Sequence, residues 1–108
     1  MPARYRVVIL DSARRDLENA FAYIFFDLSD SFAAYRFYDG IMEKVASLEV
    51  FPLGYSEFDF GAWRGLGFRR IHYKRYTIIY RVNEAERTVY ITNIIYSRRD
   101  FSRLAPGA

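Results

Sequence analysis

The apolar positions of the N-terminal half follow one short extended run and then two helical stripes. The segment of residues 4–10 is short and rich in apolar, β-branched side chains, which predicts a strand. Apolar side chains then recur every three or four positions, which predicts an amphipathic helix. The stripe of this first helix is Ala13, Leu17, Ala20, Ile24 and Leu28. A second stripe follows at the same spacing: Ala34, Tyr38, Ile41, Val45 and Leu48.

Short polar segments predict where the two helices begin and end. We expect Asp11 and Ser12 to cap the first helix and Ser31 to cap the second, because these residue types satisfy free backbone N–H groups. Pro52 and Gly54 end the second helix. Since only a few residues separate the helices, they are predicted to pack as an antiparallel hairpin.

The C-terminal half has the composition of strands. Residues 66–74 alternate roughly between apolar and polar side chains, and residues 76–82 and 87–96 are rich in β-branched and aromatic ones. The polar residues 83–86 predict a hairpin loop. Residues 55–65 predict an irregular connection, and residues 97–104 a basic tail that forms a short helix or an extra strand. The order β-α-α-β-β-β predicts an α+β fold, in which an N-terminal strand and a two-helix hairpin precede a C-terminal antiparallel sheet.

Length and composition narrow the class of protein. The 108 residues fit one domain, residues 1–108. The chain has no cysteine and one histidine, His72, which excludes disulfides, a thiol nucleophile, thiolate metal sites and histidine-rich metal centres. We therefore expect no cofactor. The longest apolar run, residues 20–26, is far shorter than the ~20 residues of a membrane helix, so we expect an intracellular protein.

Charge is distributed unevenly between the two halves. Residues 1–63 contain six Lys/Arg and ten Asp/Glu, a balance of −4, whereas residues 64–108 contain ten and three, a balance of +7. This asymmetry predicts a basic surface suited to nucleic acid or an acidic peptide. The alternative is a solvated face that only maintains solubility.

Basic residues alternate with aromatic ones throughout the C-terminal half. Guanidinium groups bind phosphate and aromatic rings stack on unpaired bases, so this pattern favours contact with nucleic acid. Strand alternation places Arg70 and His72 on one side, with Lys74, and Arg69 on the other, with Ile71 and Tyr73. The alternative is that the aromatic residues pack in the core and the arginines solvate the sheet. His72 fits a structural role better than proton transfer.

Six short strings occur in order along the chain: YRVVIL from residue 5; Ala13 with Asp16-Leu17; Ser47-Leu48 through Pro52; GFRR from residue 67; YTIIYRV from residue 76; and IIYSRRD from residue 94. With them the chain resembles toxins of the RelE/ParE superfamily of type II toxin–antitoxin modules. The resemblance implies a cytoplasmic bacterial toxin wrapped by the C-terminal segment, often acidic, of a cognate antitoxin. Through that antitoxin the complex would also reach operator DNA.

The superfamily has two active branches. One cleaves mRNA in the ribosomal A site without a metal, and for this branch the resemblance implies catalytic roles for Arg69, Arg70, Tyr96 and Arg99. Substrate binding would fall to Arg64, Lys74, Arg75 and Arg98. The other branch inhibits DNA gyrase. Thr77 stands where catalytic members have an arginine, and residues after Arg99 include no catalytic Tyr or His-Tyr pair.

Three hypotheses remain open at this point. The basic, aromatic-lined half favours a ribosome-dependent endoribonuclease. The replacement of arginine by Thr77 favours a gyrase inhibitor that acts by protein binding. The third is a non-toxic relative that binds only its antitoxin and, through it, operator DNA.

Overall fold

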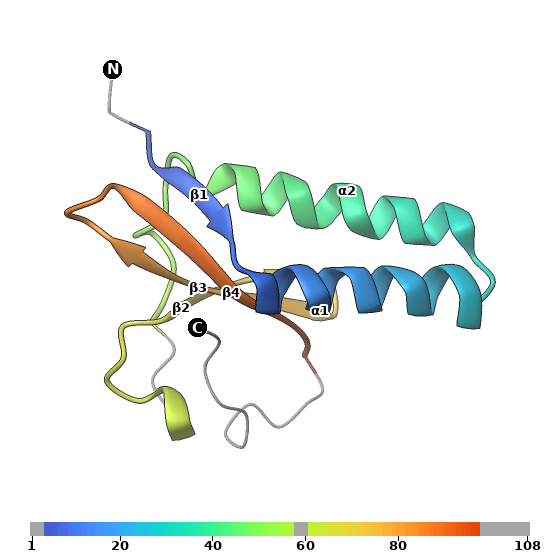
Figure 1. Cartoon of the computed structure of the whole chain (residues 1–108). Coiled ribbons are helices and arrows are strands. Elements are labelled where there is room, and N and C mark those ends of the chain that lie inside the picture. Colours follow the sequence, from blue (N-terminus) through green and yellow to red (C-terminus); the bar gives the residue numbers. More distant parts are fainter. Residues whose placement is uncertain (1–3, 58–60, 98–108) are drawn as a thin grey trace.

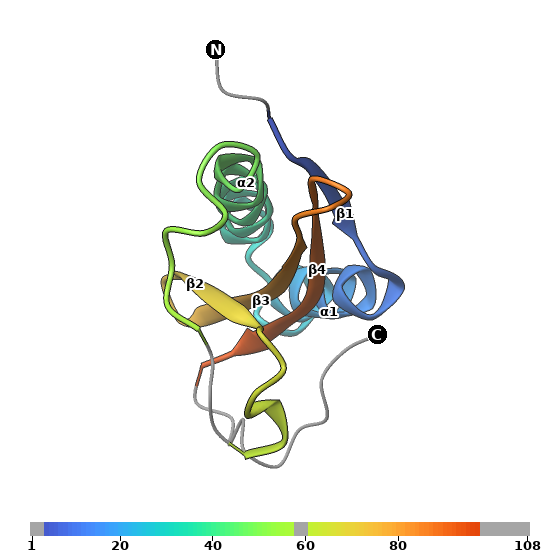
Figure 2. The same ribbon diagram turned by 90° about the vertical axis from the view of Figure 1, so that its left-hand side faces the viewer.

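The chain folds into one four-stranded sheet with a pair of helices packed against it (Figures 1 and 2). The computed structural model describes residues 4–57 and 61–97. The elements are β1 (Arg6–Ile9), α1 (Asp11–Ala22), the π-helical turn η1 (Tyr23–Asp27), α2 (Ser31–Ser47), the 3₁₀ turn η2 (Gly61–Trp63), β2 (Arg69–Tyr73), β3 (Tyr76–Asn83) and β4 (Thr88–Tyr96). The α+β class and the element order predicted from the sequence are confirmed. Within the described ranges, no helix has the length and apolar character needed to cross a bilayer.

The sheet is mixed rather than fully antiparallel. Its strand order is β1-β4-β3-β2, and β2, β3 and β4 are antiparallel as predicted, but β1 pairs parallel to β4. The helical hairpin is the reason, because two antiparallel helices return the chain to the end of the sheet where it began. The backbone N–H of Tyr5 bonds the carbonyl of Glu49 at 2.9 Å, so the end of the hairpin lies beside the start of β1.

The main core lies between the helices and one face of the sheet. Leu17 of α1 and Ile41 of α2 are buried there with Ile78 of β3 and Ile91 of β4. Each such side chain contributes about 1.5–3 kcal/mol through burial, so this layer holds the hairpin on the sheet.

Two positions of the predicted helical stripes are wrong. Leu28 is 56% exposed and Tyr38 is 42% exposed, whereas Phe37 is buried. The π-helical turn η1 adds a residue to one helical turn and so rotates Leu28 away from the α-helical stripe of the first helix. Phe37 takes the core position on α2, where its ring packs 4.7 Å from that of Tyr76.

The helix caps also differ from the prediction. Leu10 is the N-cap of α1 and no side chain caps it, because Asp11 and Ser12 already lie inside the helix. The Ser12 hydroxyl donates to the Thr92 carbonyl instead, at 2.6 Å. At α2 the cap is Asp30 rather than Ser31, and its carboxylate accepts the Ala33 N–H at 3.0 Å.

A smaller core covers part of the opposite face of the sheet. Trp63 of η2, 0% exposed, and Phe68 pack there on Ile79 and Ile95. The segment predicted as irregular therefore contributes a fully buried side chain, which a loop of mixed composition does not reveal.

Candidate functional site

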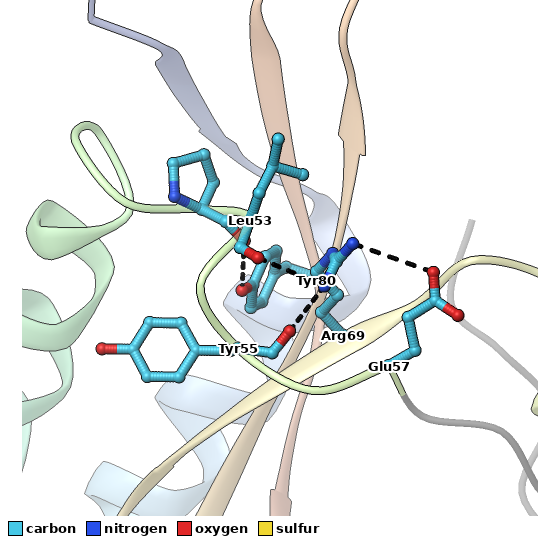
Figure 3. A network of polar contacts seen from close by, with 6 residues as sticks. Leu53, Tyr55, Glu57, Arg69 and Tyr80 are labelled. Carbon is cyan, nitrogen blue, oxygen red and sulfur yellow. Dashed lines mark hydrogen bonds and ion pairs between the residues drawn. The ribbon is translucent and has the colours of Figure 1, made fainter.

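Arg69 lies on the helix side of the sheet and binds the chain segment that connects α2 to β2 (Figure 3). Its Nη1 donates to the carbonyls of Tyr55, at 2.6 Å, and Leu53, at 3.4 Å. Its Nη2 lies 3.8 Å from Oε1 of Glu57. With a side chain only 21% exposed, this guanidinium fixes the connecting segment onto the sheet.

Tyr80 anchors the same segment from the neighbouring strand (Figure 3). Its hydroxyl donates to the Pro52 carbonyl at 2.6 Å, and the residue is 0% exposed. Burial raises the pKa of this phenol well above its ordinary value, while the charge of Arg69 acts in the opposite direction. Arg69 and Tyr80 are paired across the two strands, so they act together.

Arg70 and His72 lie on the other face, as strand alternation predicts. There His72 Nδ1 lies 3.1 Å from the Thr77 hydroxyl, which in turn lies 3.0 Å from the Ser97 hydroxyl. Thr77 is completely buried. Thr77, at the position where the resemblance implies an arginine for catalytic members, therefore contributes a small hydroxyl to a hydrogen-bonded chain.

Tyr96 ends β4 on the helix side. It pairs with Tyr76 of β3, and the two rings meet edge to face at 5.5 Å. Both line a groove of about 760 Å³ between α1 and the ends of β3 and β4. We call this the tyrosine groove; its walls are Asp16, Asn19, Ala20, Tyr23, Ile24, Leu28, Arg75, Tyr76, Ile94 and Tyr96.

A second hollow of about 230 Å³ continues the tyrosine groove under the β2–β3 turn and shares Ile24, Arg75 and Tyr76 with it. Lys74 and Arg75 form this turn, and Lys74 adopts the left-handed conformation with a φ of 52°. The Lys74 ammonium lies 5.6 Å from the centre of the Tyr73 ring. Arg36 of α2 adds a third cation.

The charge of the combined groove is positive. Lys74, Arg75 and Arg36 line it, against one carboxylate, Asp16, which accepts the Ile94 N–H at 2.9 Å. Its floor is apolar and aromatic. Such a groove suits a peptide segment that carries both acidic and hydrophobic side chains, because the cations attract the first and the apolar floor binds the second.

The structure therefore brings some predicted residues together and separates others. Lys74, Arg75 and Tyr96 share the tyrosine groove or its continuation. Arg69 and Arg70 lie on opposite faces, and Arg64 follows η2 as an exposed side chain. Arg98 and Arg99 lie outside the described residues.

Sequence reasoning missed the helical wall of the groove. Arg36, Tyr23 and Asp16 come from the helical half of the chain, and the sequence patterns predicted no role at a site for any of them. The one signal available was the density of aromatic residues around residue 23, at positions 21, 23, 25 and 26, which exceeds what a single apolar stripe needs.

Comparison with known proteins shows which family of sequences and which solved structures this chain is similar to. The sequence model for the ParE toxin of type II toxin–antitoxin systems, parDE, matches residues 7–101. A chain of the RelBE2 toxin–antitoxin complex from Mycobacterium tuberculosis is similar in structure, with a TM-score of 0.64 and 22% identity, and the match covers 86% of this chain and 98% of that one. A chain of the chromosomal ParDE system from P. aeruginosa has a TM-score of 0.69 and 15% identity, over 88% and 98%. No curated protein sequence matches this chain.

Proposed function

Because this chain belongs to the ParE toxin family of type II toxin–antitoxin systems, we propose that it inhibits DNA gyrase by binding it, and that an antitoxin segment seated in the tyrosine groove neutralises it. Such a toxin acts in the cytoplasm, where its target lies. In this proposal the toxin acts through a protein-binding surface rather than through a catalytic centre.

The choice of gyrase as target rests on the contacts of Arg69, whose guanidinium binds carbonyls within the protein. Cleavage of RNA requires a phosphate-binding cation close to groups that take up and donate a proton. Arg69 bonds two carbonyls, while Arg70 and Tyr96 are on opposite faces of the sheet. Thr77, buried between His72 and Ser97, supplies no charge. These contacts support protein binding over the mRNA cleavage that the sequence favours.

The groove supports the second half of the proposal. Arg75 lines the tyrosine groove and, with Arg36 and Lys74, the hollow that continues it, so the combined groove attracts an acidic segment. The rings of Tyr76 and Tyr96 offer apolar contact for the hydrophobic side chains of that segment. An antitoxin with an acidic, amphipathic C-terminal segment fits both properties.

Two assays run side by side on the purified toxin test the target. The first measures ATP-dependent supercoiling of a relaxed plasmid by gyrase, and the second measures the integrity of mRNA on translating ribosomes. We expect loss of supercoiling and intact message. The reverse pattern would establish a ribonuclease, and activity in neither assay would leave a non-toxic antitoxin-binding protein; both results overturn the proposal.

A pair of variants sharpens the second assay. Arg70→Ala removes the guanidinium to which the ribonuclease hypothesis assigns phosphate binding. Tyr96→Phe removes the hydroxyl to which it assigns proton donation. If the toxin inhibits gyrase, neither variant changes the amount of intact mRNA. A decrease in cleavage by either variant requires cleavage by the wild type and so rejects gyrase as the sole target.

A further inference from the structure

The hollow under the β2–β3 turn has walls that are fixed by packing within the chain. Phe37 of α2 is buried there, and its ring centre lies 4.7 Å from that of Tyr76. The Tyr73 hydroxyl donates to the Arg36 carbonyl at 3.4 Å, which holds the third ring of the hollow against α2. A side chain that enters this hollow therefore meets a preformed site and needs little rearrangement of the protein to bind.

The size and lining of the hollow favour one apolar side chain as its occupant. Its volume is about 230 Å³, which is below the ~300–1,000 Å³ of pockets that hold whole small molecules. Ile24 and Ala33 complete the apolar part of the wall. A nucleobase in such surroundings would lose the hydrogen bonds that its polar edges make with water, whereas a hydrocarbon or aromatic side chain has none to lose. The best-matched occupant is therefore a large apolar side chain of a polypeptide.

The charged residues of the hollow all have the same sign. Arg36, Lys74 and Arg75 line it, and each of them is an exposed residue. Over residues 4–57 and 61–97, none of the three has an ion-pair partner, and no carboxylate lines the hollow. Since Phe37 is buried whereas the three cations are exposed, the charges lie toward solvent and the rings lie deeper. This arrangement attracts a segment whose acidic residues flank the apolar side chain that enters.

We infer that the hollow binds one large apolar side chain of the antitoxin, and that Asp or Glu residues within four positions of it pair with the three cations. This assignment rests on the proposed antitoxin site, because the hollow continues the tyrosine groove and shares Ile24, Arg75 and Tyr76 with it. It is independent of whether the toxin inhibits gyrase. On a helical segment, residues three or four positions apart lie on one face, so an apolar residue and its acidic neighbours reach the hollow together. A large side chain in a pocket that polar groups surround is typical of a residue that dominates binding.

Filling the hollow from its own wall tests the inference. Ala33→Leu, in the full chain, places a larger side chain at a half-buried position that lines the hollow. We expect the affinity for the full-length cognate antitoxin, measured by titration calorimetry, to fall at least about tenfold. Ala46→Leu is the matched control, because it makes the same change at an exposed position of α2 outside the hollow, and its affinity should equal that of the wild type. Equal affinities of the two variants overturn the inference.

A double-mutant cycle identifies the antitoxin residues and does not rely on the variant at Ala33. Arg36→Gln changes an exposed side chain, so the variant retains the fold. In the antitoxin segment, each Asp or Glu is replaced by its amide and each large apolar residue by Ala. We expect Arg36→Gln to lose its effect once one particular acidic residue has been neutralised. A large apolar residue within four positions of that acid should lower the affinity at least about tenfold when it is replaced by Ala. If no acidic residue couples to Arg36, or if the coupled one has no such apolar neighbour, the inference is overturned.

Two further arms distinguish this side-chain site from the larger antitoxin site and from a nucleic-acid site. Ala20→Leu narrows the tyrosine groove outside the hollow. If Ala20→Leu weakens antitoxin binding and Ala33→Leu does not, the proposed antitoxin site stands and the side-chain site falls; if neither does, both fall. The second arm uses a fluorescein-labelled oligouridine as probe. Binding of this RNA that Ala33→Leu abolishes would assign the hollow to a nucleobase and overturn the inference. Thermal unfolding of each variant measures whether it is folded.

Discussion

The ring of Tyr73 lies against the backbone of Gly40, so closely that a Cβ on Gly40 would clash with the Cζ and hydroxyl end of the ring. The Tyr73 hydroxyl lies 3.4 Å from the Arg36 carbonyl, on the same helix. This contact presses the end of β2 onto the middle of α2. It explains a glycine that otherwise costs the helix about 1 kcal/mol relative to alanine.

Gly40→Ala should lower the free energy of unfolding by about 1–2 kcal/mol, because overpacking against Tyr73 outweighs the gain in helix propensity. For a domain of this size the loss corresponds to a fall in Tm of roughly 4–16 °C. Thermal unfolding followed by circular dichroism measures it. In a Tyr73→Ala background the same substitution should become neutral or stabilising. A destabilisation of equal size in both backgrounds would refute the contact as its cause.

Arg69→Ala should lower the free energy of unfolding by about 1–3 kcal/mol, because two carbonyls of the connecting segment lose a charged donor. Urea unfolding measures the change. Arg64→Ala is the matched control, since that side chain is exposed, and its effect should stay within about 0.5 kcal/mol. Equal effects from the two substitutions would remove the argument that Arg69 is a structural residue.

Stability should fall in alkaline solution. Hydrogen bonds to Glu84 and Glu86 raise the pKa of Tyr5 and Tyr90 respectively, and burial raises the pKa of Tyr80. The unfolded chain therefore loses these protons at lower pH than the folded chain does, beginning near the ordinary value of 10.0. The stabilisation is complete below that pH and is lost as pH rises through the folded values. Tm measured from pH 9 to pH 11.5 should show this fall, and Tyr80→Phe should make it shallower. A flat profile in the wild type would contradict the assignment.

Arg75→Glu should weaken the binding of an acidic antitoxin segment between about tenfold and a hundredfold, because it places like charges in contact. Titration calorimetry or fluorescence anisotropy with a labelled segment measures the change. Wild-type affinity should decrease with added salt, and the variant should respond less. Arg64→Glu, outside the groove, should bind as the wild type does. If both reversals weaken binding equally, the tyrosine groove is not the specific site.

Local periodicity predicted the helices and strands because each has a recognisable repeat, although the predicted capping residues Asp11, Ser12 and Ser31 lie inside the helices. Leu17, Ile41 and Val45 occupy the core positions that their spacing indicates. Leu28 does not, because the π-helical turn η1 changes the rotation per residue and leaves no recognisable trace in composition. On α2 the buried ring is that of Phe37 rather than Tyr38, although the other positions of the stripe are buried as predicted. The parallel pairing of β1 also escaped prediction, because strand composition does not encode which neighbour a strand selects.

The candidate site was harder to predict than the fold. Strand alternation separated Arg69 from Arg70 correctly. However, the carbonyls that bind Arg69 come from residues 14 and 16 positions away, and no local pattern announces such a contact. Arg36 enters the groove only because the β2–β3 turn folds back beneath α2. The order of the chain does not reveal that proximity.

Among the described residues, the pairing of β1 with β4 joins the first strand to the last. Contacts between distant segments form only once both segments are present, so during synthesis β1 has no partner strand until residue 96 at the end of β4 has emerged. The helical hairpin precedes β2, β3 and β4 in the chain, so its residues emerge first. A nascent toxin therefore presents its hairpin before its sheet is complete, and shortening the chain ahead of β4 should leave a product without the folded surface.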